Sequence, residues 1–178
     1  MSGRMKQRSS GKQERWAAGA KARGELHLTL SEASFPDFER AFLAHQRERL
    51  RAAASPLERL EVRRRTAEDV LTGAFSRACT WNDLKRALQR VERLGYTDVG
   101  RRVHVASLFA QCTSDFPQGV EWARRLVDDA ERRLRSVRKD HPLRQEGQEE
   151  LARVRRMTGW ESATSSAASG TSRTRPRR

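Results

Sequence analysis

The chain has 178 residues, of which 36% are hydrophobic and 34% charged, and its formal net charge is +14. This length fits one domain, and the polar balance indicates that part of the chain lies outside any core. No stretch is apolar for long enough to serve as a signal peptide or to span a membrane, so we expect a cytoplasmic protein.

The charge is concentrated at the two ends. Residues 1–24 hold seven Arg or Lys and one Glu, and residues 158–178 hold four Arg and one Glu, so these ends carry +9 of the total of +14. Ser, Gly, Arg and Lys dominate residues 1–24, and residues 161–178 lack apolar periodicity. We therefore predict flexible basic tails at residues 1–24 and 160–178 on either side of one helical domain at residues 25–159.

Apolar residues at helical spacing, combined with capping residues, predict helices along the central part. Six helix starts are expected, near Ser34, Ser55, Thr80, Thr97, Pro117 and Leu143. The first three starts place Ser or Thr before an acidic third helical residue. Short connections favour antiparallel neighbours. The fold class is thus all-α, a single compact bundle or array of five to six helices.

Residues 25–30 alternate polar and apolar side chains, which is typical of a strand. No second strand is evident. The segment is expected to lie extended across the helices with Leu26, Leu28 and Leu30 in the core, or to pair with the same segment of a second copy. The first alternative is favoured.

The residue patterns of catalytic and metal sites are missing. The four histidines, His27, His45, His104 and His141, stand apart from one another and from the cysteines. No Gly-x-Ser-x-Gly turn or glycine-rich phosphate loop occurs. Asp128 and Asp129 lie among arginines spaced for ion pairs on a helix surface. We expect a non-catalytic protein with no cofactor and no metal.

Basic residues also cluster inside the predicted domain. Residues 47–65 hold seven Arg and three Glu, and residues 85–102 hold six basic and two acidic residues. Arg86, Arg90 and Arg93 recur on one helix face, opposite the apolar stripe. Such a row can follow a phosphate backbone, although an ordinary solvated face has the same pattern.

Three further residues invite alternative interpretations. Trp16 stacks on a base, or it belongs to a short helix over residues 13–21. Arg64 interrupts an apolar stripe and must reach solvent, pair with an acid, or mark an interface. Arg101 stands where a helix-turn-helix motif around Gly95 would need a buried aliphatic residue, so an ordinary helical hairpin is favoured there.

A large positive charge makes nucleic acid the leading partner class. We expect a small basic protein that associates with DNA or RNA without catalysing a reaction. The alternative is a helical protein-interaction or regulatory module that binds an acidic protein, as an accessory factor of a plasmid, phage or other mobile element. The candidate nucleic-acid-binding residues are Arg4, Lys6, Arg8, Lys12, Trp16, Arg63, Arg86, Arg90, Arg93, Arg101 and Arg102.

Overall fold

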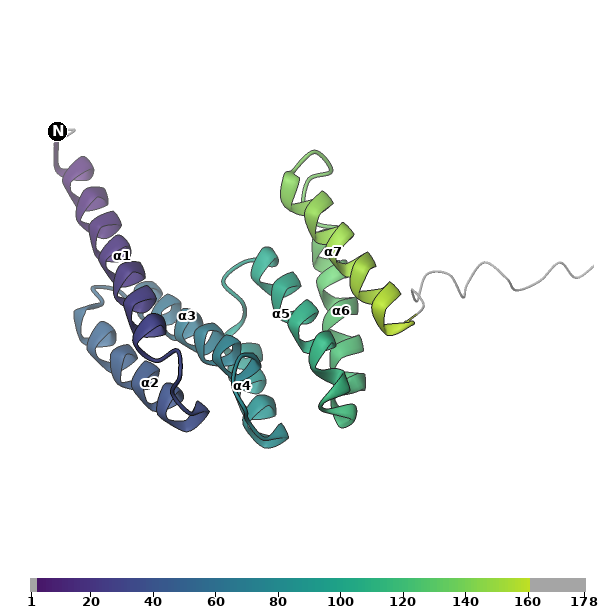
Figure 1. Cartoon of the computed structure of the whole chain (residues 1–178). Coiled ribbons are helices and arrows are strands. Elements are labelled where there is room, and N and C mark those ends of the chain that lie inside the picture. Colours follow the sequence, from purple (N-terminus) through teal and green to yellow (C-terminus); the bar gives the residue numbers. More distant parts are fainter. Residues whose placement is uncertain (1–2, 161–178) are drawn as a thin grey trace, which may run out of the picture. The chain divides into compact units, whose positions relative to one another are not determined.

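The computed structural model describes residues 3–160, and for residues 3–12 it describes the backbone alone. Within this range it contains seven α-helices, two short 3-10 helices and no strand (Figure 1). The all-α class is confirmed, but the predicted count of five to six helices is wrong. None of the described helices is long and apolar enough to cross a membrane.

The chain divides into two compact units, residues 1–97 and residues 98–178. The sequence predicts one domain over residues 25–159, because a chain of this length usually forms a single core. Each unit here has its own apolar core, built from neighbouring helices.

The first unit consists of α1 (Gly3–Thr29), α2 (Phe35–Ala52), α3 (Pro56–Phe75) and α4 (Trp81–Leu94). The predicted caps are confirmed at all three positions, since the side chains of Ser34, Ser55 and Thr80 each accept a hydrogen bond from the backbone amide three residues later. Gly95 ends α4 with φ at 74°, a conformation that suits glycine.

Helix α1 overturns two expectations. It runs through residues 3–24, which the sequence predicts as a flexible tail, and it continues through the strand-like residues 25–29. The alternation of polar and apolar residues fails as a strand signal because no partner strand exists among the described residues. The leucines also do not share a core side, since Leu28 is 78% exposed. The C-terminal tail, apart from Trp160, lies outside the described residues.

The core of the first unit lies between α2, α3 and α4. Phe35, Phe38 and Phe42 of α2 are fully buried, and the rings of Phe38 and Phe42 stack with centroids 4.5 Å apart. They face the apolar stripes of the two following helices, which are Val62, Ala67, Val70, Leu71 and Ala74 of α3 and Leu84, Ala87, Leu88 and Val91 of α4. Leu57, predicted as part of the α3 stripe, is 67% exposed because it lies in the first turn, beyond the packed region.

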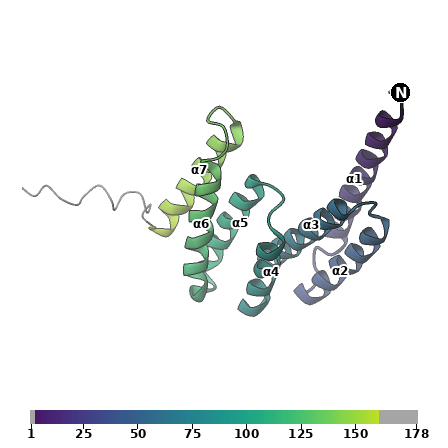
Figure 2. The same ribbon diagram turned by 180° about the vertical axis from the view of Figure 1, so that it is seen from behind.

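The second unit contains α5 (Val99–Gln111), the 3-10 helices η1 (Cys112–Ser114) and η2 (Pro117–Gly119), α6 (Val120–Leu134) and α7 (Pro142–Thr158). The three α-helices lie side by side in both views (Figures 1 and 2). Asp98 caps α5, which corrects the prediction of Thr97, and the Thr97 hydroxyl instead binds Glu68 within the first unit. Helices α4 and α5 thus belong to different units.

Candidate nucleic-acid interface

The predicted arginine row on α4 is held by acidic side chains. Arg86 contacts Glu39 of α2 at 3.2 Å and Asp83 at 3.0 Å, and Arg90 contacts Glu39 at 3.1 Å. The Glu39 side chain is only 15% exposed. Arg93 donates from Nε to the carbonyl oxygen of Gln89. Arg86 and Arg90 therefore tie α4 to α2, whereas Arg93 is exposed and, among the described residues, bonds only within its own helix.

Trp16 is half-buried in the first unit. The guanidinium groups of Arg49 and Arg65 lie over its ring, 5.5 and 5.0 Å from the ring centroid. The helical alternative for residues 13–21 is confirmed, because they lie within α1. Trp16 thus packs against two cations of its own chain, an arrangement that stabilises the docking of α1.

The remaining candidate residues lie in α1, in α3 and in the second unit, and their side chains differ in whether they have partners. The side chains of Arg4, Lys6, Arg8 and Lys12 lie outside the described residues. In the second unit Arg102 forms an ion pair with Asp129, and Arg101 is half-buried with partners of its own. Arg63 on α3 is exposed, and its side chain makes no ion pair or hydrogen bond with any other described residue.

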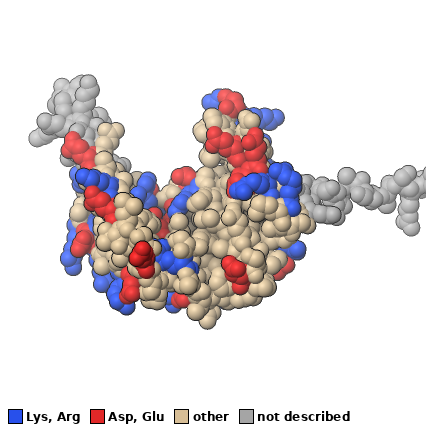
Figure 3. Space-filling view, in the orientation of Figure 1, with Lys and Arg blue, Asp and Glu red and all other residues tan. Residues whose placement is uncertain are grey.

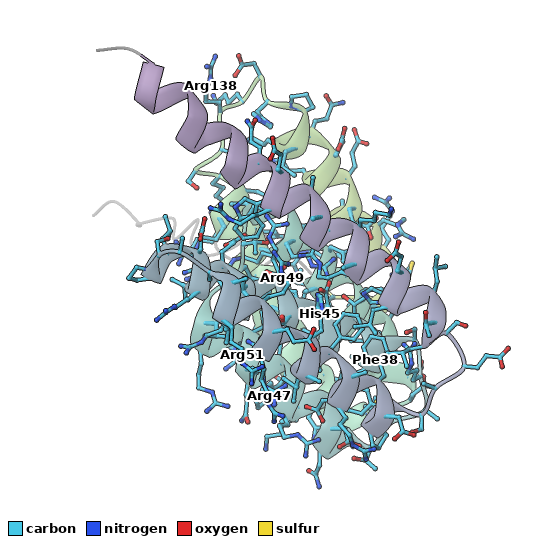
Figure 4. The ribbon with its side chains drawn as sticks, turned by 90° about the vertical axis from the view of Figure 1, so that its left-hand side faces the viewer. Phe38, His45, Arg47, Arg49, Arg51 and Arg138 are labelled. Atoms are coloured by element: carbon cyan, nitrogen blue, oxygen red, sulfur yellow. The ribbon has the colours of Figure 1, made fainter. Side chains whose placement is uncertain are left out.

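Arg47, Arg51 and Arg59, which were not among the candidates, share this property with Arg63 in the first unit, and Arg135 and Arg156 share it in the second unit. Arg47 and Arg51 lie one turn apart on α2, and Arg59 lies one turn before Arg63 on α3. All four are exposed and have no partner among the described side chains. We call this set, Arg47, Arg51, Arg59 and Arg63, the hairpin arginines. Figure 4 shows Arg47 and Arg51 on the side of α2 that faces away from α1.

The hairpin arginines gather at one end of the first unit. Helix α2 ends at Ala52 and α3 begins at Pro56, so the pairs flank a three-residue connection. With a rise of about 1.5 Å per residue, every one of the four lies within about 11 Å of that connection along its helix. Two of the three acids in this stretch are already engaged, because Glu58 accepts from Arg15 and Glu61 pairs with Arg65.

Elsewhere acidic and basic side chains are mixed. Figure 3 shows red and blue side by side in several of the charged areas of the visible face, with uncharged surface between them. On α6, as predicted, Asp128 and Asp129 are engaged in ion pairs: Asp128 contacts Arg155, and Asp129 contacts Arg102, Arg132 and Arg133. Among the described residues, no cluster of three or more His, Cys, Asp or Glu could hold a metal ion.

Comparisons of the chain with protein families, with curated proteins and with solved structures find no match.

Proposed function

We propose that this chain binds nucleic acid without strong sequence preference and that the hairpin arginines contact its phosphates. The observation that carries the proposal is that four exposed arginines without ion pairs to any described residue flank one short connection, whereas Arg86 and Arg90 of α4 have carboxylate partners. A guanidinium that already has a carboxylate partner gains little from a phosphate, whereas an exposed unpaired one releases condensed counterions when it binds. The basic residues at both ends of the chain add to the same electrostatic attraction.

The spacing of the hairpin arginines suits a contact with the nucleic-acid backbone. Residues four apart on a helix have Cβ atoms about 6 Å apart, and each arginine has a planar group that can bind a phosphate through two hydrogen bonds. Two such pairs near the connected ends of α2 and α3 present four guanidinium groups. Contacts of this kind fix position on a duplex or a single strand and do not read base sequence.

Fluorescence anisotropy tests the proposal with a labelled DNA duplex, single-stranded DNA and RNA of equal length across a salt series. The wild type should bind at low salt and weaken steeply as salt rises. Replacing all four hairpin arginines with Gln should reduce the slope of log K against log salt by about 2 to 4, since each phosphate contact contributes about 0.7 to 0.9.

The matched control removes the same charge from ion-paired positions. Arg124, Arg132, Arg133 and Arg138 are exposed, and each has a carboxylate partner within the second unit. Their replacement with Gln should change the slope by less than about 1. The proposal is wrong if no nucleic acid binds at low salt, or if the two quadruple variants have equal slopes. If the chain binds no nucleic acid but captures an acidic protein, the result would favour the alternative function, a helical protein-interaction module.

The basic residues at the N-terminus need substitution and not deletion. Within the first unit, residues 13–29 of α1 contact α2 and α3 through Arg15, Trp16 and Arg23. Removing residues 1–24 would therefore also damage the fold. Gln at positions 4, 6, 8 and 12 removes the charge and leaves these contacts in place. A smaller salt slope in this variant would assign part of the affinity to this segment.

A further inference from the structure

A cavity of about 270 Å³ lies within the first unit between α1, α2 and α3. Much of its wall is apolar, formed by Ala18 and Ala22 of α1, Ala52 of α2 and Val62 of α3. Trp16, His45 and Arg49 also line it. Figure 4 shows His45 and Arg49 between α1 and α2, on the opposite side of α2 from Arg47 and Arg51. We call this cavity the α1 pocket.

Arg49 brings to the α1 pocket a positive charge with which no described carboxylate forms an ion pair. The neighbouring cations each have a carboxylate: Arg15 contacts Glu58 at 3.2 Å, Arg23 contacts Asp69 at 3.2 Å, and Arg65 contacts Glu61 at 2.8 Å. Arg49 is half-buried and forms no ion pair with any described residue. Burial, followed by repulsion from Arg23 and Arg65, lowers the pKa of Arg49 below its ordinary value, and attraction to Asp69 opposes this in part.

The position of the Arg49 guanidinium depends on Gly19. A methyl group added at Gly19 would stand 2.3 Å from the Arg49 Cζ, so the guanidinium lies directly against the backbone of α1. The Arg49 Cζ atom also lies over the Trp16 ring, 5.5 Å from the ring centroid, so the guanidinium is confined to one wall of the pocket. A charged group held in place at a half-buried site, without an ion-pair partner of its own, is favourable for binding an anion. Glu58, which also lines the pocket, is engaged with Arg15.

His45 also contributes to the wall of the α1 pocket. Its Nε2 atom is buried and has no hydrogen-bond partner among the described residues. Solvent does not reach this nitrogen, so His45 lines the α1 pocket with other atoms of its side chain.

We propose that the α1 pocket binds a small organic acid, with its carboxylate on Arg49 and its apolar body against the alanines, Val62 and Trp16. A carboxylate matches a guanidinium through two parallel hydrogen bonds and supplies one negative charge, which is the charge that Arg49 lacks. Inorganic phosphate would bring excess charge and leave the apolar wall uncovered. The volume lies just below the range of about 300 to 1,000 Å³ of typical ligand sites, so the acid is compact.

The proposal is independent of the nucleic-acid binding proposed above, because the α1 pocket and the hairpin arginines use different side chains. A titration of the full-length, ¹⁵N-labelled protein with sodium benzoate at constant ionic strength tests it. The indole N–H signal of Trp16, assigned with a Trp16→Phe variant, and the Nε–H signal of Arg49 should shift and saturate with a Kd of about 1 mM or tighter. Benzamide, the neutral analogue, and inorganic phosphate should cause no saturable shift at the same positions.

Two variants and a control separate the pocket from general charge effects. Arg49→Gln should weaken benzoate binding by about tenfold or more. Ala22→Leu should abolish it by filling the cavity while Arg49 stays in place. Arg47→Gln removes a neighbouring charge from the opposite side of α2 and should leave the affinity unchanged. Benzoate should also raise the melting temperature of the wild type and of Arg47→Gln, but not that of the two pocket variants.

Four results would overturn the proposal: no saturable shift at Trp16 up to about 20 mM benzoate, equal affinity for benzamide, equal or tighter binding of phosphate, or unchanged affinity in Arg49→Gln. None of these results bears on the salt slopes of nucleic-acid binding, so the two proposals fail separately.

Discussion

Arg64 of α3 donates a hydrogen bond from Nε to the carbonyl oxygen of Leu94, 2.7 Å away, at the last residue of α4. The final carbonyls of a helix have no partner within the helix and lie at the negative end of its dipole. A guanidinium at this point satisfies one of them and adds favourable charge. This explains why a charged residue interrupts the apolar stripe of α3: it caps the neighbouring helix.

Loss of this cap should destabilise the first unit. We expect Arg64→Met to lower the free energy of unfolding by about 1 to 2 kcal/mol, because a charge-assisted hydrogen bond is lost and a carbonyl is left unsatisfied. The neighbouring Arg63→Met variant removes an exposed side chain without partners and should change stability by less than about 0.5 kcal/mol. Urea unfolding followed by circular dichroism compares the two. Equal effects would show that the Leu94 contact does not stabilise the fold.

Two glycines inside helices should respond to alanine with opposite signs. At Gly73 of α3, an added Cβ would lie 2.1 Å from the ring of Phe38, which is fully buried. The ring must move, so we expect Gly73→Ala to destabilise by about 1 to 3 kcal/mol despite the better helix propensity of alanine. At Gly24 of α1, nothing lies within 4 Å of an added Cβ. Gly24→Ala should therefore stabilise by about 0.5 to 1 kcal/mol.

Thermal or urea unfolding of the two variants provides the measurement. Stabilisation by Gly73→Ala would mean that α2 and α3 are less closely packed than the structure shows. A neutral or destabilising Gly24→Ala would contradict the continuous helix through residues 3–29. The second outcome matters most for function, since the α1 pocket depends on that helix.

Glu68 should hold the end of the first unit in place. Its side chain is buried in α3, where Oε1 accepts from the Thr97 amide at 2.8 Å and from the Thr97 hydroxyl at 3.1 Å. In Glu68→Ala the amide loses its acceptor, and we expect a loss of about 2 kcal/mol. Glu68→Gln keeps an acceptor oxygen and should lose less. Hydrogen exchange of the Thr97 amide should be slow in the wild type and fast in Glu68→Ala; equal exchange rates would refute this role.

The sequence predicts local features of this fold well. Ser34, Ser55 and Thr80 are recognised as caps because each signal lies within four residues of the helix start. The strand-like pattern at residues 25–30 misleads because six residues are too few to separate a period of 2 from a helical one. Whether the segment joins the preceding helix depends on contacts with α2 and α3, such as the packing of His27 on Phe42 with ring centroids 4.6 Å apart.

The site residues show where sequence patterns stop being informative. The spacing of Arg86 and Arg90 correctly places them on one face, but their charge is compensated by Glu39, 47 and 51 residues earlier in the chain. Which of the seven arginines at residues 47–65 lack a partner is likewise decided by tertiary contacts. The α1 pocket brings Trp16 and Arg49 together from separate helices, and no local pattern predicts that contact.

The pH dependence of stability should report on the burial of His45. Burial, together with the charge of Arg49 and Arg23, lowers its pKa below the ordinary value of 6.5, and Glu48 and Asp69 oppose this in part. The unfolded chain takes up a proton at His45 as the pH falls through 6.5, whereas the folded chain takes it up only at lower pH. The free energy of unfolding should therefore be unaffected by His45 above this pH and decrease as the pH falls from 6.5 toward the folded pKa.

A His45→Gln variant isolates this contribution, because the carboxylates that titrate at lower pH are common to both proteins. Urea unfolding at a series of pH values from about 7.5 to 5 should give a curve for the wild type that falls more steeply below pH 6.5 than that of His45→Gln. Parallel curves would show that His45 is as accessible to protons in the folded chain as in the unfolded one. If benzoate binds in the α1 pocket, a saturating concentration should raise the pKa of His45 toward its ordinary value. The reason is that a carboxylate near the imidazole favours the protonated form.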